Sequence, residues 1–267
     1  MTKAMLIDTT RCIGCRSCQV ACKSWNELPA EKTAFSETGS NPRHLDASNF
    51  TRVLFLESPA PGGAVRWSFV KRQCMHCLEP ACASACPVGA LEKLATGPVV
   101  YRDDRCIGCR YCMLACPFQI PKYQWSARVP YVRKCDFCAD RQALAKKPAC
   151  VETCPGEALR FGERDQLLAE AHRRMKASPG PYAPEVYGER TAGGTSMLYL
   201  TAVPFQALGL HHRGFRTDLG ETAVGQASQA WMSGVPWVAL AVGALSTGLY
   251  HLNQRRHRVK EQEEKGD

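Results

Sequence analysis

Sixteen cysteines in four groups of four constrain this chain more than any other feature of its 267 residues. Two groups have the spacing C-x2-C-x2-C-x3-C, one has C-x2-C-x4-C-x3-C, and the last is two pairs separated by eleven residues. In chain order the groups are Cys12, Cys15, Cys18 and Cys22; Cys74, Cys77, Cys82 and Cys86; Cys106, Cys109, Cys112 and Cys116; and Cys135, Cys138, Cys150 and Cys154. Because no cysteine is left over, the count predicts four [4Fe–4S] clusters with four thiolate ligands each.

The spacings suit a compact cofactor that is approached from several directions. A tight C-x2-C-x2-C loop supplies three thiolates, and the fourth cysteine lies on the following helix and points away from the loop. In two-cluster ferredoxins that fourth cysteine binds the other cluster. Gly14 and Gly108 lie inside two of the loops, where the missing Cβ lets backbone amides approach the sulfurs.

Zinc and disulfides are the alternative uses of so many cysteines. Structural zinc sites use paired C-x2-C knuckles separated by a spacer, rather than four cysteines within eleven residues repeated along the chain. Disulfides need Cα separations that neighbours in one tight loop rarely offer. The repeated spacing favours iron–sulfur clusters over both.

Spacing alone leaves open which groups share clusters. Nineteen residues separate Cys86 from Cys106, and eighteen separate Cys116 from Cys135. The third group can therefore pair with either neighbour, and the two remaining groups would then combine.

The net charge of +9 has two readings. It is typical of proteins that bind nucleic acid or anionic lipid. However, each oxidised cluster with four thiolates carries about −2, so four clusters nearly cancel the excess. We interpret the basicity first as compensation for the clusters and second as a binding patch. The residues that flank the cysteine loops are Arg11, Arg16, Arg105, Arg110, Arg133 and Lys134.

The first 165 residues are predicted to form one four-cluster domain, in which metal ligation replaces part of an apolar core. Residues 4–8 should form a strand that enters the first loop. The insertion at residues 23–73 should contain a hairpin of two alternating segments, 51–57 and 64–71. Between the second and third groups we expect a short helix, a turn and a strand.

After Pro155 the cysteine pattern stops. Residues 163–176 have apolar side chains at helical spacing, residues 178–196 are rich in turn formers, and residues 197–203 suit a strand. The predicted segment 166–229 is therefore a helix followed by an extended arm that contacts a partner subunit.

A membrane helix is predicted at residues 230–254. No Asp, Glu, Lys or Arg occurs between Thr222 and Gln254, and the apolar centre, residues 231–252, spans about 33 Å as a helix. Basic residues dominate the following tail, 255–267, whereas Asp218 and Glu221 precede the helix. The positive-inside rule then places the C-terminus in the cytoplasm and the cluster domain in the periplasm, on a bacterial inner membrane.

Residues 1–10 contain no apolar h-region, cleavage site or twin-arginine leader. An exported domain without its own signal would cross the membrane already folded, so we expect export together with a partner that carries a twin-arginine leader.

The motifs RCIGCRSCQVACKSW, QCMHCLEPACASACP, CIGCRYCMLACPF, KCDFCADR and PACVETCPGEAL resemble those of the four-cluster iron–sulfur (beta) subunits of respiratory formate dehydrogenases. They are equally similar to the ferredoxin-type subunit of periplasmic uptake [NiFe] hydrogenases. The resemblance covers nearly the whole chain. It implies an α+β fold of two pseudo-symmetric two-cluster ferredoxin modules with an inserted hairpin, an extended arm and one C-terminal transmembrane helix.

The resemblance also implies how the groups combine: the first with the fourth, and the second with the third. We number the four implied ligand sets I to IV. Set I is Cys12, Cys15, Cys18 and Cys154; set II is Cys22, Cys135, Cys138 and Cys150; set III is Cys74, Cys77, Cys82 and Cys116; set IV is Cys86, Cys106, Cys109 and Cys112.

Outside the cysteine groups the sequence shows no nucleophile–base motif, no phosphate-binding loop and no spare metal ligands. With four cysteines on each cluster, no iron has an open position for substrate. The sequence therefore predicts a non-catalytic electron-transfer subunit. The resemblance implies a molybdenum or tungsten pterin subunit as donor, or hydrogenase subunits in the alternative, and a membrane cytochrome b or quinone-site subunit as acceptor.

Overall fold

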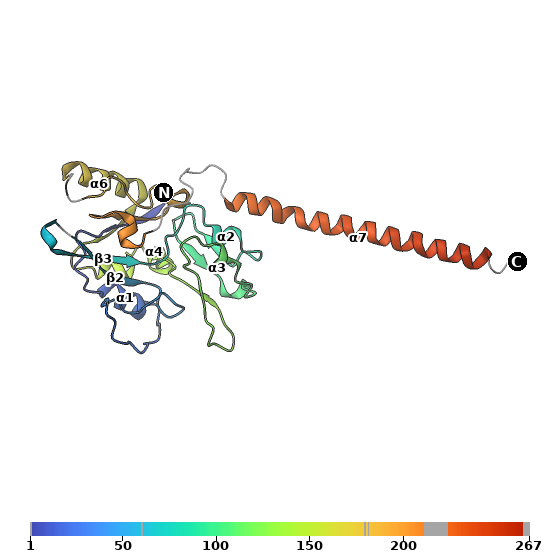
Figure 1. Cartoon of the computed structure of the whole chain (residues 1–267), viewed down its shortest axis with the longest axis horizontal. Helices are drawn as coiled ribbons and strands as arrows, with labels where there is room; N and C mark the ends of the chain where they lie inside the picture. Colours follow the sequence, from blue (N-terminus) through green and yellow to red (C-terminus); the bar gives the residue numbers. More distant parts are fainter. Residues whose placement is uncertain (1, 60, 179, 181, 211–223, 264–267) are drawn as a thin grey trace. The chain divides into compact units, whose positions relative to one another are not determined.

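The computed structural model describes residues 2–59, 61–178, 180, 182–210 and 224–263 (Figure 1). The chain divides into two compact units, residues 1–225 and 226–267. All sixteen cysteines lie in the first unit.

A three-stranded sheet forms the centre of the first unit. Its middle strand is β1 (Lys3–Asp8), which pairs antiparallel with β8 (Leu159–Glu163) and parallel with β9 (Met197–Leu200). Met5 and Ile7 pack into one apolar core, and Ala4 and Leu6 into another on the opposite face. Burial on both faces explains why this strand is continuously apolar, and it confirms the predicted strand at residues 4–8.

The predicted hairpin in the insertion is confirmed. Strands β2 (Arg52–Pro59) and β3 (Val65–Arg72) pair antiparallel along their whole length, from Arg52 opposite Arg72 to Pro59 opposite Val65. Phe55 and Phe69 face each other across the ladder with ring centroids 4.8 Å apart. Val53 of β2 and Val70 of β3 are fully buried, and they anchor this end of the hairpin on the domain.

The connection between the second and third cysteine groups differs from the prediction. The predicted strand is present as β5 (Val99–Tyr101), but the predicted helix is wrong: its residues form β4 (Leu91–Lys93), which pairs with β5 in a hairpin. Leu91 and Val99 are buried together in a small core, which favours pairing over a short isolated helix. Gly97 allows the turn, because its φ is +119° and a Cβ would lie 2.6 Å from the carbonyl oxygen of Lys3. A further hairpin, β6 (Lys122–Tyr123) and β7 (Val132–Arg133), connects the third group to the fourth.

Short helices lie within or directly beside the cysteine groups. They are α1 (Ser17–Trp25), α2 (Ala81–Ser84), α3 (Tyr111–Ala115), α4 (Ala139–Ala143) and α5 (Ala149–Glu152). One-turn 3₁₀ segments lie at Pro61–Gly63, Asp103–Arg105, Thr191–Gly193 and Phe205–Leu208. The helices α1 and α5 contact each other, as do α2 and α3. The first and fourth groups are therefore neighbours, and so are the second and third.

The amphipathic helix predicted at residues 163–176 is α6 (Arg164–Ala177), which buries Leu167 and Ala171 against the sheet. Beyond it, residues 182–210 contribute to both apolar cores: Tyr187, Tyr199 and Leu208 are each no more than 2% exposed. The arm thus packs into this chain's own domain, which the sequence analysis did not anticipate. Contact with a partner subunit stays a prediction. Asp218 and Glu221 lie outside the described residues.

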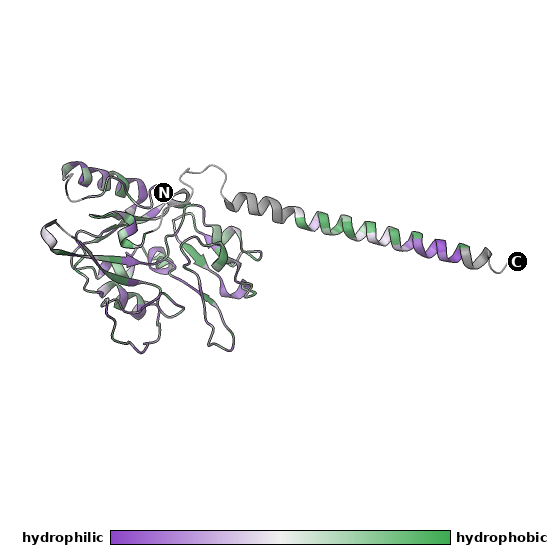
Figure 2. Ribbon diagram, viewed as in Figure 1, coloured by the Kyte–Doolittle hydropathy of each residue, from purple (hydrophilic) through white to green (hydrophobic). Residues whose placement is uncertain are grey.

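One long helix, α7 (Val224–Glu263), forms the second unit. Its residues Gly234–Val259 are long and apolar enough to cross a membrane, and none of the apolar window is buried within the chain. Figure 2 shows the apolar stretch followed by a hydrophilic end. The helix extends beyond both predicted ends, residues 230 and 254, so the basic tail is helical as far as Glu263. Side-chain hydrogen bonds one turn apart, from Gln254 to Tyr250 and from Arg258 to Gln254, follow this helical tail.

Candidate iron–sulfur cluster sites

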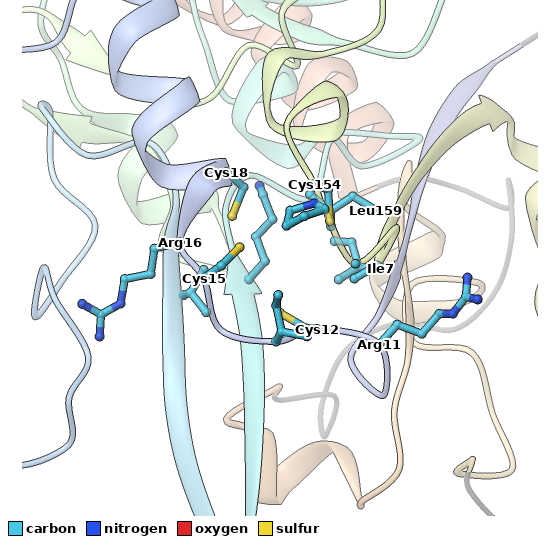
Figure 3. Close-up of a pocket in the computed structure, with 14 residues that line it drawn as sticks. Ile7, Arg11, Cys12, Cys15, Arg16, Cys18, Cys154 and Leu159 are labelled. Atoms are coloured by element: carbon cyan, nitrogen blue, oxygen red, sulfur yellow. The ribbon is translucent and has the colours of Figure 1, made fainter.

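The first cavity lies where the loop after β1 meets the residues after α5. Cys12, Cys15, Cys18 and Cys154 line it, which are the four members of set I. Their side chains surround a common space in Figure 3, with about 420 Å³ of room including its open mouth. Ile7, Val53 and Leu159 supply apolar walls. The structure thus brings together cysteines that are more than 130 residues apart in the sequence.

The second cavity lies on the other side of the α1–α5 pair. Cys22, Cys135, Cys138 and Cys150, the four members of set II, line about 370 Å³ of space. The helix α1 carries Cys18 to the first cavity and Cys22 to the second, and the segment of α5 does the same with Cys154 and Cys150. Each helix therefore serves both cavities, as the spacing predicted.

The cysteines of sets III and IV also lie together. Burial raises the pKa of the Cys77 thiol well above its ordinary value, and the neighbouring Cys74, Cys82 and Cys116 raise it further. Burial likewise raises the pKa of Cys112 to about 11, with contributions from Cys86, Cys109 and Cys106. In each case the thiols that raise the pKa further are the other three cysteines of the same set.

The sets follow one another in a line. Burial raises the pKa of Cys18 to about 12, and Cys150 of set II is among the charges that add to the shift. Burial of Cys135 in set II raises its pKa, with Cys74 of set III a weaker contributor. Cys82 of set III has its pKa raised to about 12 by burial and, more weakly, by Cys112 of set IV. The thiols of sets I and II, of sets II and III, and of sets III and IV therefore influence one another electrostatically.

Backbone amides point at several of the sulfurs. The nitrogens of Gly108 and Phe137 donate to Cys106 Sγ and Cys135 Sγ, each at 3.4 Å. After the last cysteine of a group, the nitrogens of Ala90 and Ile120 donate to Cys86 Sγ at 3.2 Å and to Cys116 Sγ at 3.5 Å. Such donors stabilise thiolate charge and tune a bound cluster.

The tight loop of the first group depends on glycine. Gly14 has a φ of +69°, and a Cβ at this position would lie 2.9 Å from the ring of Phe69. The β2–β3 hairpin thus covers the first loop closely. The insertion therefore has a structural role as a cover over the cysteines.

The arginines predicted to supply positive charge beside the clusters mostly turn outward. Arg11 and Arg16 point away from the cavity in Figure 3. The guanidinium of Arg16 lies 4.4 Å from the ring centre of Phe55, and that of Arg110 lies 5.2 Å from Trp125, which is itself 68% exposed. The ring of Trp125 therefore covers an arginine on the surface.

Buried lysines supply the inward charge instead. Lys134, which the sequence analysis named, is 6% exposed and donates to the carbonyl oxygens of Val99 and Cys135. Lys71, which it missed, is 2% exposed and lines both cavities. It lies at the end of β3 in the predicted hairpin, where an alternating pattern gives no sign that a lysine faces inward.

The donor set fits iron–sulfur clusters. Each of the four sets described above brings four thiols together. The cavities of sets I and II have largely apolar walls. Among the residues that the structure describes, no group of three or more His, Cys, Asp or Glu is arranged to hold a single metal ion. A zinc ion draws four sulfurs to about 2.3 Å from one point, whereas a cubane keeps its thiolates apart around a larger core. Four thiols at each site are the donor set that a [4Fe–4S] cluster requires.

Comparison with known proteins gives the same cofactor. Two family profiles, each described as a 4Fe-4S dicluster domain, match residues 11–90 and 65–164. Together with the sixteen cysteines they account for four [4Fe–4S] clusters.

Three relatives cover most of the chain. A protein of Nitratidesulfovibrio vulgaris is 42% identical over 263 residues, which are 97% of this chain and 69% of that protein. The hydrogenase-2 operon protein HybA of Escherichia coli O157:H7 is 37% identical over 77% of this chain and 72% of its own length. The iron–sulfur subunit of the nitrate-inducible formate dehydrogenase of Escherichia coli K12 is 39% identical over 74% of this chain and 67% of its own. The chain therefore belongs to the family of four-cluster, electron-transferring iron–sulfur subunits that includes these hydrogenase-2 and formate dehydrogenase proteins.

Proposed function

We propose that this chain relays single electrons through four [4Fe–4S] clusters, from a periplasmic catalytic subunit of the formate dehydrogenase type to a membrane cytochrome b or quinone-reducing subunit. The observation that carries the proposal is the grouping of the cysteines: two cavities are each lined by the four thiols of one set, and thiols of successive sets influence one another's pKa. A line of closely spaced redox centres is what electron transfer requires. Since four cysteines satisfy each cluster, the clusters offer no open iron for substrate, and the chain has no catalytic role of its own.

We assign the ligands as the four sets I to IV. The first and second cavities support sets I and II, because each is lined by the four cysteines of one set and by no others. The pKa of Cys77 is raised by the other three thiols of set III, and that of Cys112 by the other three of set IV, which supports these two sets. In this assignment every cluster takes three cysteines from one group and the fourth from the partner group.

The pairing of groups is tested by Cys154→Ser and Cys22→Ser in the purified complex. Cys154→Ser should alter only the electron paramagnetic resonance signal that Cys12→Ser also alters, whereas Cys22→Ser should share its signal with Cys138→Ser. If Cys154→Ser instead shared its signal with Cys138→Ser, the crossed assignment would be wrong.

The second candidate is the same relay role in a membrane-bound [NiFe] hydrogenase. The relative named for the hydrogenase-2 operon covers as much of this chain as the formate dehydrogenase subunit does. Purification from detergent-solubilised membranes, followed by metal analysis, separates the two. A catalytic partner with molybdenum or tungsten supports the first, and one with nickel supports the second. About sixteen irons per copy of this chain are expected in either case. A much lower iron content after anaerobic purification would contradict the relay.

We further propose that α7 anchors the chain in the inner membrane, with the cluster domain in the periplasm. The length and composition of Gly234–Val259 support the anchor, and Arg255, Arg256 and Arg258 at its end support a cytoplasmic C-terminus. Protease added to intact spheroplasts should digest the cluster domain. Protection of that domain would contradict the orientation.

A further inference from the structure

Lys71 is the one residue among those described that is charged, almost fully buried and placed against two cavities at once. Lys71 is the residue before the last of β3, and 2% of its surface is exposed. The cavity of set I and the cavity of set II both include it in their linings. A single ammonium group therefore lies between two positions that, on the function proposed above, hold anionic clusters.

No carboxylate neutralises this ammonium within the part of the chain that the structure describes. Its hydrogen-bond acceptor is Gln73 Oε1 at 2.9 Å, a neutral group. Asp136 also lines the second cavity, but the charged groups that act on that carboxyl are Lys134 and Asp140.

The charges that do act on Lys71 come from the cysteines. Cys150, Cys18, Cys135 and Cys22 line the same two cavities as Lys71. A buried ammonium without a partner of opposite charge is costly, and anionic clusters held by these cysteines would supply that charge. These four sulfurs belong to both sets, since Cys18 is in set I and the other three are in set II.

We propose that Lys71 is a shared counter-ion that raises the reduction potentials of clusters I and II together. It is a positioning residue, acting on the clusters through its field and taking no part in bond changes. When either cluster accepts an electron from its neighbour, its negative charge increases by one. A fixed positive charge stabilises that reduced state more than the oxidised state. Neither a proton nor a ligand has to move, and the lysine remains an ammonium throughout.

The inference rests on the proposed ligand sets and makes a selective prediction. Clusters I and II should respond to the loss of this charge. Cluster IV should not, because the charged neighbours of its buried thiol Cys112 are other cysteines. A general loosening of the fold would not change the reduction potentials of clusters I and II while leaving that of cluster IV unchanged.

The test is a redox titration of the purified complex, followed by electron paramagnetic resonance, on wild type and Lys71→Met. Signals are assigned beforehand with Cys15→Ser for cluster I and Cys138→Ser for cluster II. In Lys71→Met both potentials should fall, so that the reduced-to-oxidised ratio at a fixed potential drops tenfold or more. For a one-electron couple a tenfold change corresponds to about 59 mV. Lys71→Arg keeps the charge and should retain most of the wild-type potential.

Lys176→Met provides the matched control. It removes the same charge from the exposed end of α6, where water and salt screen its field. Its potentials should equal those of wild type. The Lys71→Met shift should persist at high salt, because a buried charge is screened little.

The possible outcomes distinguish failure of this inference from failure of the proposed electron relay. Clusters absent from the wild-type complex would overturn both. Four clusters present, with unchanged potentials of clusters I and II in Lys71→Met, would overturn the role of Lys71 alone. If Lys71→Met loses clusters I and II while Lys71→Arg keeps them, the charge is required by those clusters and the inference stands. Loss in both variants would contradict it, because packing rather than charge would then be the cause.

Discussion

Replacing Arg174 by methionine should destabilise the domain beside the first cysteine loop, because it removes the cation that faces a buried carboxylate. Asp8 ends β1 just before that loop, and its side chain is 1% exposed. Arg174 Nη1 on α6 lies 2.9 Å from Asp8 Oδ2. The hydroxyl of Tyr182 also donates to Oδ2, at 3.1 Å, and the nitrogen of Thr10 donates to Oδ1 at 3.0 Å.

The magnitude follows from what remains after the substitution. Removing one partner of a buried ion pair costs about 3–5 kcal/mol, because the other charge stays buried. Since Tyr182 and Thr10 still donate to Asp8, we expect the lower end, about 3 kcal/mol. In a domain of this size each kcal/mol lowers the melting temperature by about 2–4 °C. Arg174→Met should therefore melt about 6–12 °C below wild type.

The assay is loss of the visible cluster absorbance on heating at one fixed rate, since unfolding with cluster loss is irreversible. Arg160→Met is the control. Arg160 lies 3.8 Å from Glu170, which also pairs with Arg174, but its side chain is 47% exposed. An exposed pair contributes about 0–1 kcal/mol, so the melting temperature of this variant should fall by no more than about 4 °C. Equal shifts for the two arginine variants would refute the role of the buried carboxylate.

Three other predictions test the cluster sites, the contact between hairpin and sheet, and the anchor. Cys109→Ser should remove or alter the cluster IV signal alone in an electron paramagnetic resonance spectrum, and an unchanged spectrum would contradict its place as a ligand. Gly97→Ala should destabilise the domain by about 3 kcal/mol in the same melting assay, because its Cβ would meet Lys3 O at 2.6 Å. Gly62→Ala, where φ is +77° but no atom lies within 4 Å, should cost only about 1 kcal/mol, and equal effects would exclude the close approach as the cause. Leu240→Asp combined with Leu245→Asp should release the chain from membranes into an alkaline carbonate wash, since each charge costs about 3 kcal/mol at a membrane centre; continued retention would argue against α7 as the anchor.

The cysteine spacing and the strand patterns made much of the fold predictable. The spacing of each group determines a loop and a short helix, and the runs at residues 4–8, 51–57 and 64–71 correspond to β1, β2 and β3. The hairpin of β4 and β5 was not predictable, because three-residue strands have no periodicity to detect. What determines them is the burial of Leu91 and Val99 in a shared core, together with the turn at Gly97.

The same limit applies to residues 182–210. Turn-forming residues dominate the start of this segment, so its local sequence indicates an extended arm on a surface. Its burial comes instead from β9, which pairs parallel with β1, almost two hundred residues earlier in the chain. Parallel pairing at this separation depends on how the intervening cysteine groups fold, which no local pattern records. Tyr187 and Phe205 then complete the core beside β9, with ring centroids 5.2 Å apart.

Position in the sequence was a poor guide to which basic side chains face the cysteine cavities. Proximity along the chain favoured Arg11 and Arg16, which adjoin the first cysteines, yet both guanidinium groups point away from the cavity (Figure 3). An arginine beside a tight loop can reach water easily, whereas a lysine at the end of a covering strand has its whole side chain under the hairpin. Lys71 is three residues from Cys74 of set III but lines the cavities of sets I and II. The hairpin that carries it therefore does more than cover the first loop, because it brings one ammonium group to the lining of both cavities.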